Sequence, residues 1–456
     1  TPSFPGFAQM PVMTPDGGIY EPGDAGETIT MSVDSPDAVI YYTRNMGDPT
    51  AETSPSNFLY EAPVSLAEYT QVYRARTYEE GLWPSRITTN SYIQRGDYTI
   101  PVMSVVMERQ HWSGTGTGIY QPYDQRWWKH EVPVHVEYWE PDGTFAFEFD
   151  SGLKTNGSGS LGYDMISFRL LLRGGYGTDA IDYPLFGEDF PVQSFKRVIL
   201  RSAGHDWDQG HLRDVLIHLN SAQMGIETLA YQPAAVWING EYWGLVNLRE
   251  RPDEYYLASH YEDQGVTANN VDLLEFGGGA LAGESWEYYD LTAYLAEENM
   301  NIPENYEHAQ TLMDVDGMSD YVIGQTYFAN DDWPWNNIKY WQPQGPDGRW
   351  RWIMYDTDFG LGLWWRSPDM NVLSYAINND YIYNVLNPLL DNREYKVRFA
   401  NRYADYMNTI FLPENAQEIV NETARRIEHE IPYQQERWGF SEATWYDSID
   451  FINGWL

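Results

Sequence analysis

Side chains with carboxylate or amide oxygens gather in two short segments of this chain. "NDDWPWNNIKYW" runs from Asn330 to Trp341, and "YDTDFG" runs from Tyr355 to Gly360. The first segment contains Asp332 and Asn337, and the second contains Asp356 and Asp358. Mg²⁺, Mn²⁺ and Ca²⁺ prefer oxygen ligands of this kind. The two segments therefore predict a site for a divalent cation.

The spacing within these segments also suits phosphoryl transfer. Asp332 and Asn337 are separated as the Asp and Asn of a protein-kinase catalytic loop are, and Asp358-Phe359-Gly360 spells the metal-binding triplet. Such a site needs one carboxylate to orient the attacking hydroxyl and further oxygens to hold the metal. The alternative is that these acids cap turns or hold a stabilising calcium. An acidic chain contains Asp-x-Asp by chance, as Asp206-Trp207-Asp208 illustrates.

Regular elements must bring the two segments together. "DGMSDYVIGQTYFAN", residues 316–330, has helical periodicity, so Asp331 and Asp332 are expected in the loop that follows a helix. "NIKYWQ" and "RWRWIMY" alternate apolar and polar residues around the turn "PQGPDG". We therefore expect a strand pair whose second strand ends just before Asp356.

The remaining sequence predicts two domains, and the chain as a whole is expected to be of the α+β class. Residues 13–94 carry short alternating runs between Gly, Pro, Asp and Ser, which is typical of a small β-sandwich. Beyond Tyr98 come longer strands, a helix that stops at Gly225, a hairpin that turns on Asn239-Gly240, and a helical C-terminal segment. We predict a small β-sandwich over 1–97, which a resemblance given below describes as Ig-like, and an α+β body over 98–456.

Composition excludes several classes of function. Among 456 residues, 67 Asp and Glu against 28 Lys and Arg give a formal net charge of −39, which opposes binding to nucleic acid or anionic lipid. This acidity suits a salty medium, a calcium-rich exterior, or simple solubility. The chain has no Cys, which excludes disulfides and thiolate chemistry. It shows no HExxH, G-x-S-x-G or P-loop motif.

The sequence is also expected to belong to an exported protein that does not insert into a membrane. No apolar run approaches the roughly 20 residues that span a bilayer. The sequence opens "TPSFPGFAQMPV" without an initiator Met, which fits either a mature form after removal of a signal segment or a trimmed chain. We expect it to be secreted or held at the cell surface.

Residues 98–440 resemble the CotH family, named for a spore-coat protein with an atypical protein-kinase-like fold. The motifs that carry the resemblance are "DWPWNNIKYW", "RWRWIMYDTDFGLG", "WINGEYWGLVNLRERPDEYYL", "RVILRSAGHDW", "LRDVL" and "RWG". The resemblance implies Asp332 as the catalytic-loop Asp and Asn337, or its neighbour Asn336, as a metal ligand. It also implies Asp356 and Asp358 as the second metal-binding element, and Glu250 near the hinge where an adenine docks.

The glycine turn before "SFRL" matches the family in part. Gly157, Gly159 and Ser160 are kept and are expected to contact a nucleotide. Leu161 and Ile166 stand where the family carries Arg and Lys, which should weaken binding of a triphosphate. The cations that could replace them are Lys154, Arg169 and Arg173.

The N-terminal stretch resembles the Ig-like module on the C-terminal side of chitobiases and hexosaminidases. "IYYT", "DPT" and "YRART" followed by a Gly and "PS" carry this resemblance. It implies a spacer or supporting role.

Three functions follow as expectations. The first is an exported CotH-like kinase that uses Mg²⁺ or Mn²⁺ with ATP and phosphorylates a surface or coat protein. The second is an inactive, pseudokinase-like surface or assembly protein that keeps the acidic cleft for Ca²⁺. The third is a glycan-binding surface protein, which would require an exposed aromatic row.

Overall fold

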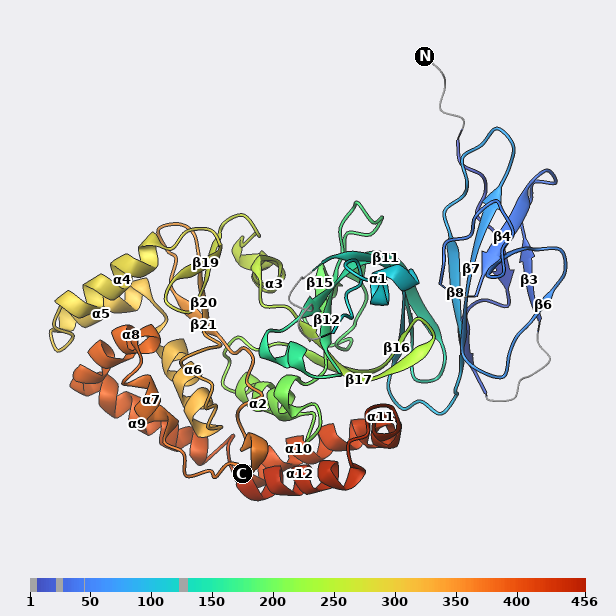
Figure 1. Ribbon diagram of the computed structural model, residues 1–456. Helices are drawn as coiled ribbons and strands as arrows, with labels where there is room; N and C mark the ends of the chain where they lie inside the picture. The colour runs from blue at the N-terminus through green and yellow to red at the C-terminus, as the bar shows by residue number, and fades with distance from the viewer. Residues whose placement is uncertain (1–5, 22–27, 45, 123–129) are drawn as a thin grey trace, which may run out of the picture. The chain divides into compact units, whose positions relative to one another are not determined.

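A computed structural model describes residues 6–21, 28–44, 46–122 and 130–456. The chain forms two compact units. The first unit contains residues 1–179, 233–246 and 429–439, and the second contains residues 180–232, 247–428 and 440–456. Both strands and helices are present, and the predicted α+β class is confirmed (Figure 1). The predicted boundary at residues 97 and 98 stays a prediction.

The N-terminal part of the first unit consists of two sheets. One has the order β1-β3-β6 and the other the order β2-β8-β7-β4-β5. Their bounds are β1 Val12–Thr14, β2 Gly18–Tyr20, β3 Thr28–Ser32, β4 Val39–Thr43, β5 Asn57–Leu59, β6 Val64–Ser65, β7 Gln71–Tyr78 and β8 Thr88–Gln94. Ile29 and Met31 of β3 share a buried core with Tyr73 and Tyr92 of the other sheet. This core holds the two sheets face to face, because each strand turns alternate side chains inward.

The rest of the first unit consists of longer strands and two helices. The strands follow the order β17-β16-β9-β10-β11-β12 within a closed barrel that β15 (Arg197–Arg201) completes. The bounds are β9 Val102–Val106, β10 Val132–Trp139, β11 Phe145–Asn156, β12 Ser167–Leu171, β16 Tyr231–Ile238 and β17 Glu241–Glu250, with α1 Arg109–Ser113 and α11 Ile431–Trp438. Asn239 and Gly240 join β16 to β17 with φ angles of 54° and 78°, which confirms the predicted two-residue turn.

The second unit combines a four-stranded sheet with most of the helices. The sheet has the order β19-β18-β20-β21, with bounds β18 Val271–Glu275, β19 Gly279–Ala282, β20 Lys339–Pro343 and β21 Arg351–Ile353. Three short strands are β13 Ile181–Asp182, β14 Ser194–Phe195 and β15 Arg197–Arg201, and β15 pairs antiparallel with the end of β17. The predicted pairing of β20 with β21 is confirmed.

The helices of the second unit follow the apolar periodicity of the sequence. They are α2 Arg213–Ala222, α3 Glu254–His260, α4 Trp286–Glu297, α5 Pro303–Leu312, α6 Val315–Tyr327, α7 Val372–Ala376, α8 Asp380–Asp391, α9 Arg393–Met407, α10 Pro413–Ile427 and α12 Glu442–Trp455. Asp314 begins α6 by accepting a hydrogen bond from the Gly317 backbone N–H. The predicted helices over α2 and α6 are confirmed.

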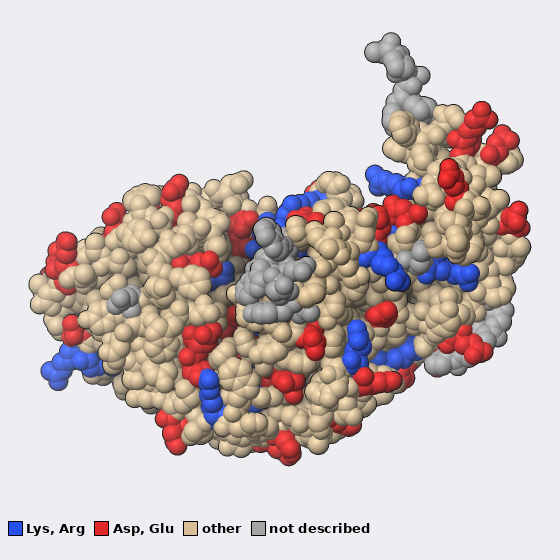
Figure 2. All heavy atoms as spheres, viewed as in Figure 1, with Lys and Arg blue, Asp and Glu red and all other residues tan. Residues whose placement is uncertain are grey.

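The surface reflects the acidic composition. Figure 2 shows Asp and Glu side chains spread over the visible face, with Lys and Arg in smaller groups between them. Within the described part of the chain, none of the helices is both long and apolar enough to cross a membrane.

Candidate functional site

The loop after α6 holds Asp332 with two asparagine side chains. Trp333 anchors this loop, because its side chain is fully buried and its Nε1–H donates to Tyr321 Oη at 2.9 Å. Asn336 Nδ2 and Asn337 Nδ2 both donate to Asp332 Oδ2, at 3.1 and 2.8 Å. With both amide nitrogens turned toward the carboxylate, the amide oxygen of Asn337 is its remaining ligand atom.

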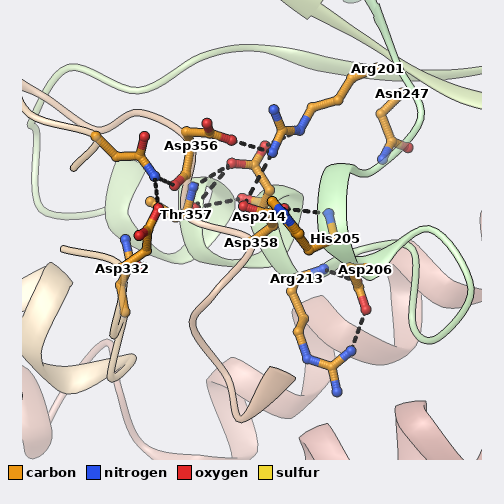
Figure 3. A network of polar contacts seen from close by, with 12 residues as sticks. Arg201, His205, Asp206, Arg213, Asp214, Asn247, Asp332, Asp356, Thr357 and Asp358 are labelled. Carbon is orange, nitrogen blue, oxygen red and sulfur yellow. Dashed lines mark hydrogen bonds and ion pairs between the residues drawn. The ribbon is translucent and has the colours of Figure 1, made fainter. Parts of the chain in front are cut away.

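The loop after β21 meets the loop after α6 at Asp356. Asn337 Nδ2 also donates to the backbone carbonyl oxygen of Asp356, at 3.1 Å. Asp356 has a φ of 53° and Asn337 a φ of 58°, so both residues adopt left-handed backbone. Next along the chain, the Thr357 backbone N–H donates to Asp214 Oδ1 at 2.9 Å, which ties the loop to α2. Figure 3 shows Asp332 and Asp356 on neighbouring loops.

A single arginine of β15 contacts three carboxylates of this region. Arg201 Nη2 lies 2.5 Å from Asp356 Oδ1 and 3.5 Å from Asp358 Oδ1. Arg201 Nε lies 3.6 Å from Asp214 Oδ2 (Figure 3). We call Asp332, Asn337, Asp356 and Asp358, with Arg201 and Asp214, the acidic site. All of its members belong to the second unit.

Asp356 and Asp358 have different surroundings. Asp358 has a side chain only 2% exposed, and its Oδ2 accepts from the His205 backbone N–H at 2.6 Å and lies 3.3 Å from His205 Nδ1. Asp356 has a side chain 30% exposed. Asp358 therefore organises the loop that precedes α2, while Asp356 offers an accessible carboxylate oxygen.

Asp214 is a buried anion shared by two arginines. Its Oδ2 lies 2.7 Å from Arg249 Nη1, and Arg249 is 1% exposed. Although burial raises it, the charges of Arg249 and Arg201 hold the pKa of Asp214 well below its usual range. Asp214 therefore stays ionised and fixes the position of Arg201 beside the site.

Negative charge at the acidic site exceeds what Arg201 neutralises. Burial raises the pKa of Asp332, and the carboxylate of Asp356 adds to this rise. Burial also raises the pKa of Asp356 against the opposing effect of Arg201, with Asp358 and Asp214 contributing repulsion. Burial is the largest cause of both rises, so these carboxylates are costly to ionise in place, and a bound cation would offset part of that cost. The carboxylate and amide oxygens of Asn337 and Asp356 are of the type that could hold Mg²⁺, Mn²⁺ or Ca²⁺.

The structure thus brings five of the sequence-predicted residues together: Asp332, Asn336, Asn337, Asp356 and Asp358. Glu250 lies elsewhere in the second unit. It is 3% exposed, and its oxygens contact His260 Nε2 at 2.7 Å and the Ala230 backbone N–H at 2.9 Å. Its predicted contact with an adenine stays a prediction.

The predicted glycine turn belongs to the first unit. Gly157 has a φ of 105°, and a Cβ at this position would overlap Ser160 Oγ, which explains a glycine here. Gly159 and Ser160 lie in a short 3₁₀ helix over Gly159–Gly162. Arg169 on β12 pairs across the sheet with Lys154 on β11.

Leu161 and Ile166, which replace the expected cations, are fully buried. These two positions therefore place no charge at a phosphate. Of the cations that could replace them, Lys154 Nζ lies 3.8 Å from Glu131 Oε2 and Arg173 Nη2 lies 3.3 Å from the same atom. Glu131 thus already neutralises part of the charge of both.

The second Asp-x-Asp has a structural role. Asp206 is fully buried, accepts from the Gly210 and Arg213 backbone N–H groups at 3.0 and 2.9 Å, and forms an ion pair with the Arg213 guanidinium. It stabilises the start of α2. The structural role considered for such acids therefore applies to Asp206.

Sequence reasoning did not identify the polar residues that surround the predicted ligands. These are Arg201, His205, Asp214, Arg249 and Thr357. Arg201, His205 and Asp214 lie in "RVILRSAGHDW" and "LRDVL", two motifs that carry the family resemblance. All three are polar or charged residues in segments whose pattern predicts buried strands or a buried helix face. Charged residues are rarely buried without a partner, so this mismatch was the signal that could have identified them.

The fold and the site define an α+β protein with an acidic site suited to a divalent cation. Residues 153–456 match the family described as CotH kinase protein, which covers more than half of the chain. The chain belongs to this family, as the sequence predicted. Residues 29–92 match the module described as Fn3 associated. No curated protein matches the chain.

Proposed function

We propose that this protein is an exported kinase that binds Mg²⁺ or Mn²⁺ with ATP at the acidic site and phosphorylates a surface or coat protein. The observation that carries the proposal is the convergence of Asp332, Asn337 and Asp356 through the two hydrogen bonds of Asn337. These are the residue types that phosphoryl transfer requires at one place.

Each residue has a role that its contacts support. Asp332 would orient the acceptor hydroxyl and take its proton, since its carboxylate has a raised pKa. Asn337 and Asp356 would hold the metal ion, whose charge would offset that of the phosphates. Arg201 holds Asp356 in place at 2.5 Å and adds one positive charge. Glu250 is the proposed nucleotide contact within the second unit, and Gly157, Gly159, Ser160 and Arg169 stay nucleotide contacts predicted from the sequence.

A second function is favoured by the burial of Leu161 and Ile166. Without cations at these positions, the protein would bind a triphosphate weakly. The acidic site would then hold Ca²⁺ in an inactive surface or assembly protein.

Thermal unfolding with Mg²⁺ or Mn²⁺, with and without ATP, separates these functions. The wild type is compared with Asp356→Asn, which keeps the shape of the side chain and removes its charge. A ligand at about a hundred times its Kd stabilises the native state by about 2.7 kcal/mol. We expect an ATP-dependent rise in Tm in the wild type that is absent in Asp356→Asn.

Asp347→Asn is the matched control, because Asp347 is exposed in the turn between β20 and β21. It should respond to metal and ATP as the wild type does. Stabilisation by Ca²⁺ or Mg²⁺ alone, with nothing added by ATP, would contradict the kinase proposal and support the second function.

A further inference from the structure

The hairpin of β10 and β11 places four side chains that can bind or orient a metal on one face. His135 pairs across the strands with Asp150, and Glu137 pairs with Glu148. Residues two apart on a strand, and residues directly opposite each other, share a face. His135, Glu137 and Glu148 each bring one ligand atom to within 4.8 Å of the others. We call these three residues with Asp150 the β10–β11 cluster, and it lies in the first unit.

Glu137 is a buried carboxylate with one of its two oxygens lacking a hydrogen-bond partner. It is 2% exposed, and its Oε1 accepts from the Ser91 backbone N–H at 3.1 Å. Its Oε2 is buried without a hydrogen-bond partner. Within the described part of the chain, neither Lys nor Arg forms an ion pair with it. A buried carboxylate is costly to ionise unless a proton or a cation compensates it, so this oxygen can accept a positively charged ligand.

His135 is oriented as a metal ligand. Its Nδ1 lies 2.9 Å from Asp150 Oδ1, which fixes the ring and, with Nδ1 as the donor, leaves the Nε2 lone pair available. Nε2 is buried without a hydrogen-bond partner and lies 3.7 Å from Glu148 Oε2. Two ligands bound to one Zn²⁺ at about 2.0–2.2 Å lie about 3.4 Å apart in a tetrahedron. A carboxylate behind the histidine is the usual outer partner of a metal-bound imidazole.

We propose that His135, Glu137 and Glu148 bind a divalent transition metal ion of the zinc class, with Asp150 orienting the histidine. The imidazole nitrogen distinguishes this cluster from the all-oxygen acidic site, because nitrogen ligands favour Zn²⁺ over Mg²⁺ and Ca²⁺. Glu148 is 56% exposed, so solvent can occupy the remaining coordination position. Since Glu137 also accepts from Ser91 of β8, the ion would link β8 to the β10–β11 hairpin.

Titration of the untagged full chain with Zn²⁺, after removal of metals with a chelator, tests the proposal. Calorimetry should detect one tight site, and Co²⁺ in its place should give a visible d–d absorption band. His135→Gln and Glu148→Gln should each lose at least about tenfold in affinity, and Asp150→Asn about tenfold. Because Glu148 is exposed, its substitution leaves the fold intact if the His135 variant unfolds.

Two controls separate this site from other binding. His308→Gln replaces an exposed histidine of α5 and should bind Zn²⁺ as the wild type does. Asp356→Asn should also retain the site, which makes the result independent of the proposed kinase function. The proposal is overturned if His135→Gln and Glu148→Gln keep wild-type affinity, or if Mg²⁺ displaces Zn²⁺ at equal concentration. The first result would leave the cluster as a proton-binding ion pair, and the second would mean that it does not select metals of the zinc class.

Discussion

At the scale of single residues, burial gives neighbouring acids different tasks. Asp358 is almost fully buried and bonds the His205 backbone, whereas Asp356 is partly exposed and contacts Arg201. Asp332 is partly buried, and its Oδ2 accepts hydrogen bonds from the side-chain amides of Asn336 and Asn337. The accessible carboxylates of Asp332 and Asp356 are therefore the groups whose protonation should respond to a bound cation.

Asp332→Asn should change how stability depends on pH. Because the folded-state pKa of Asp332 is raised above 3.8, its stabilising contribution is present at low pH and is lost as pH rises through the folded-state pKa. In a chelator, the Tm of the wild type minus that of the variant should therefore be largest below pH 3.8 and should fall as the pH rises through the folded-state pKa of Asp332. Calorimetric melts of both proteins over this range provide the measurement.

In Asp332→Asn, the side-chain amide oxygen can still accept hydrogen bonds from Asn336 and Asn337, so the loop should keep its structure. Adding saturating Mn²⁺ at about pH 7 should raise the Tm of the wild type more than that of the variant. A Tm difference that stays constant with pH would show that Asp332 carries no raised pKa.

At the scale of elements, the connection from β15 to α2 is shaped by left-handed backbone. Ala203, Gly204 and His211 have φ angles of 66°, 65° and 64°. The tight turn at Gly204 brings the His205 N–H to Asp358, while Arg201 at the end of β15 contacts Asp356. A short connection thus joins a strand of the second unit to the loop after β21.

Gly204→Ala should destabilise the protein more than Gly225→Ala. Both glycines have positive φ, of 65° and 78°, so both substitutions impose a similar backbone cost of about 1–2 kcal/mol. A Cβ at Gly204 would also overlap Asp358 Oδ2, whereas one at Gly225 meets no atom within 4 Å. We expect a total of about 2–5 kcal/mol for Gly204→Ala. Denaturant unfolding of the two variants measures the difference, and equal losses would argue against a clash with Asp358.

At the scale of the whole molecule, charge sets the conditions for stability. A formal net charge of −39 causes self-repulsion in the folded chain, and the acidic residues are spread over the face seen in Figure 2. Added salt screens such repulsion, and the Debye length falls to about 3 Å at 1 M.

Salt should therefore stabilise this protein in the absence of divalent cations. In a chelator, the Tm should rise by a few degrees from low salt to about 1 M NaCl. KCl should act equally, since screening depends on ionic strength and not on the particular monovalent ion. A Tm that falls with salt would mean that surface ion pairs outweigh the net repulsion.

Periodicity predicted the elements that frame the site. The apolar spacing of α2 and α6 and the alternation of β20 and β21 appear in the structure, because burial of one face is encoded locally. The loop after α6 and the loop after β21 were expected to meet, and the bond from Asn337 to the Asp356 carbonyl joins them. Arg201 and Asp214 were not predicted as site residues. They are far from Asp356 in the sequence, and local residue spacing does not indicate contacts over such separations.

By itself, the sequence determined the family, the α+β class and the acids available for a cation, because these depend on residue types and local spacing. Only the tertiary structure decided which acids are neutralised. Arg201 and Asp358 meet across 157 positions of the chain, and His135, Glu137 and Glu148 meet through the register of a hairpin. Charge interactions depend on distance in space and on exclusion of water, and these are set only when distant segments pack together.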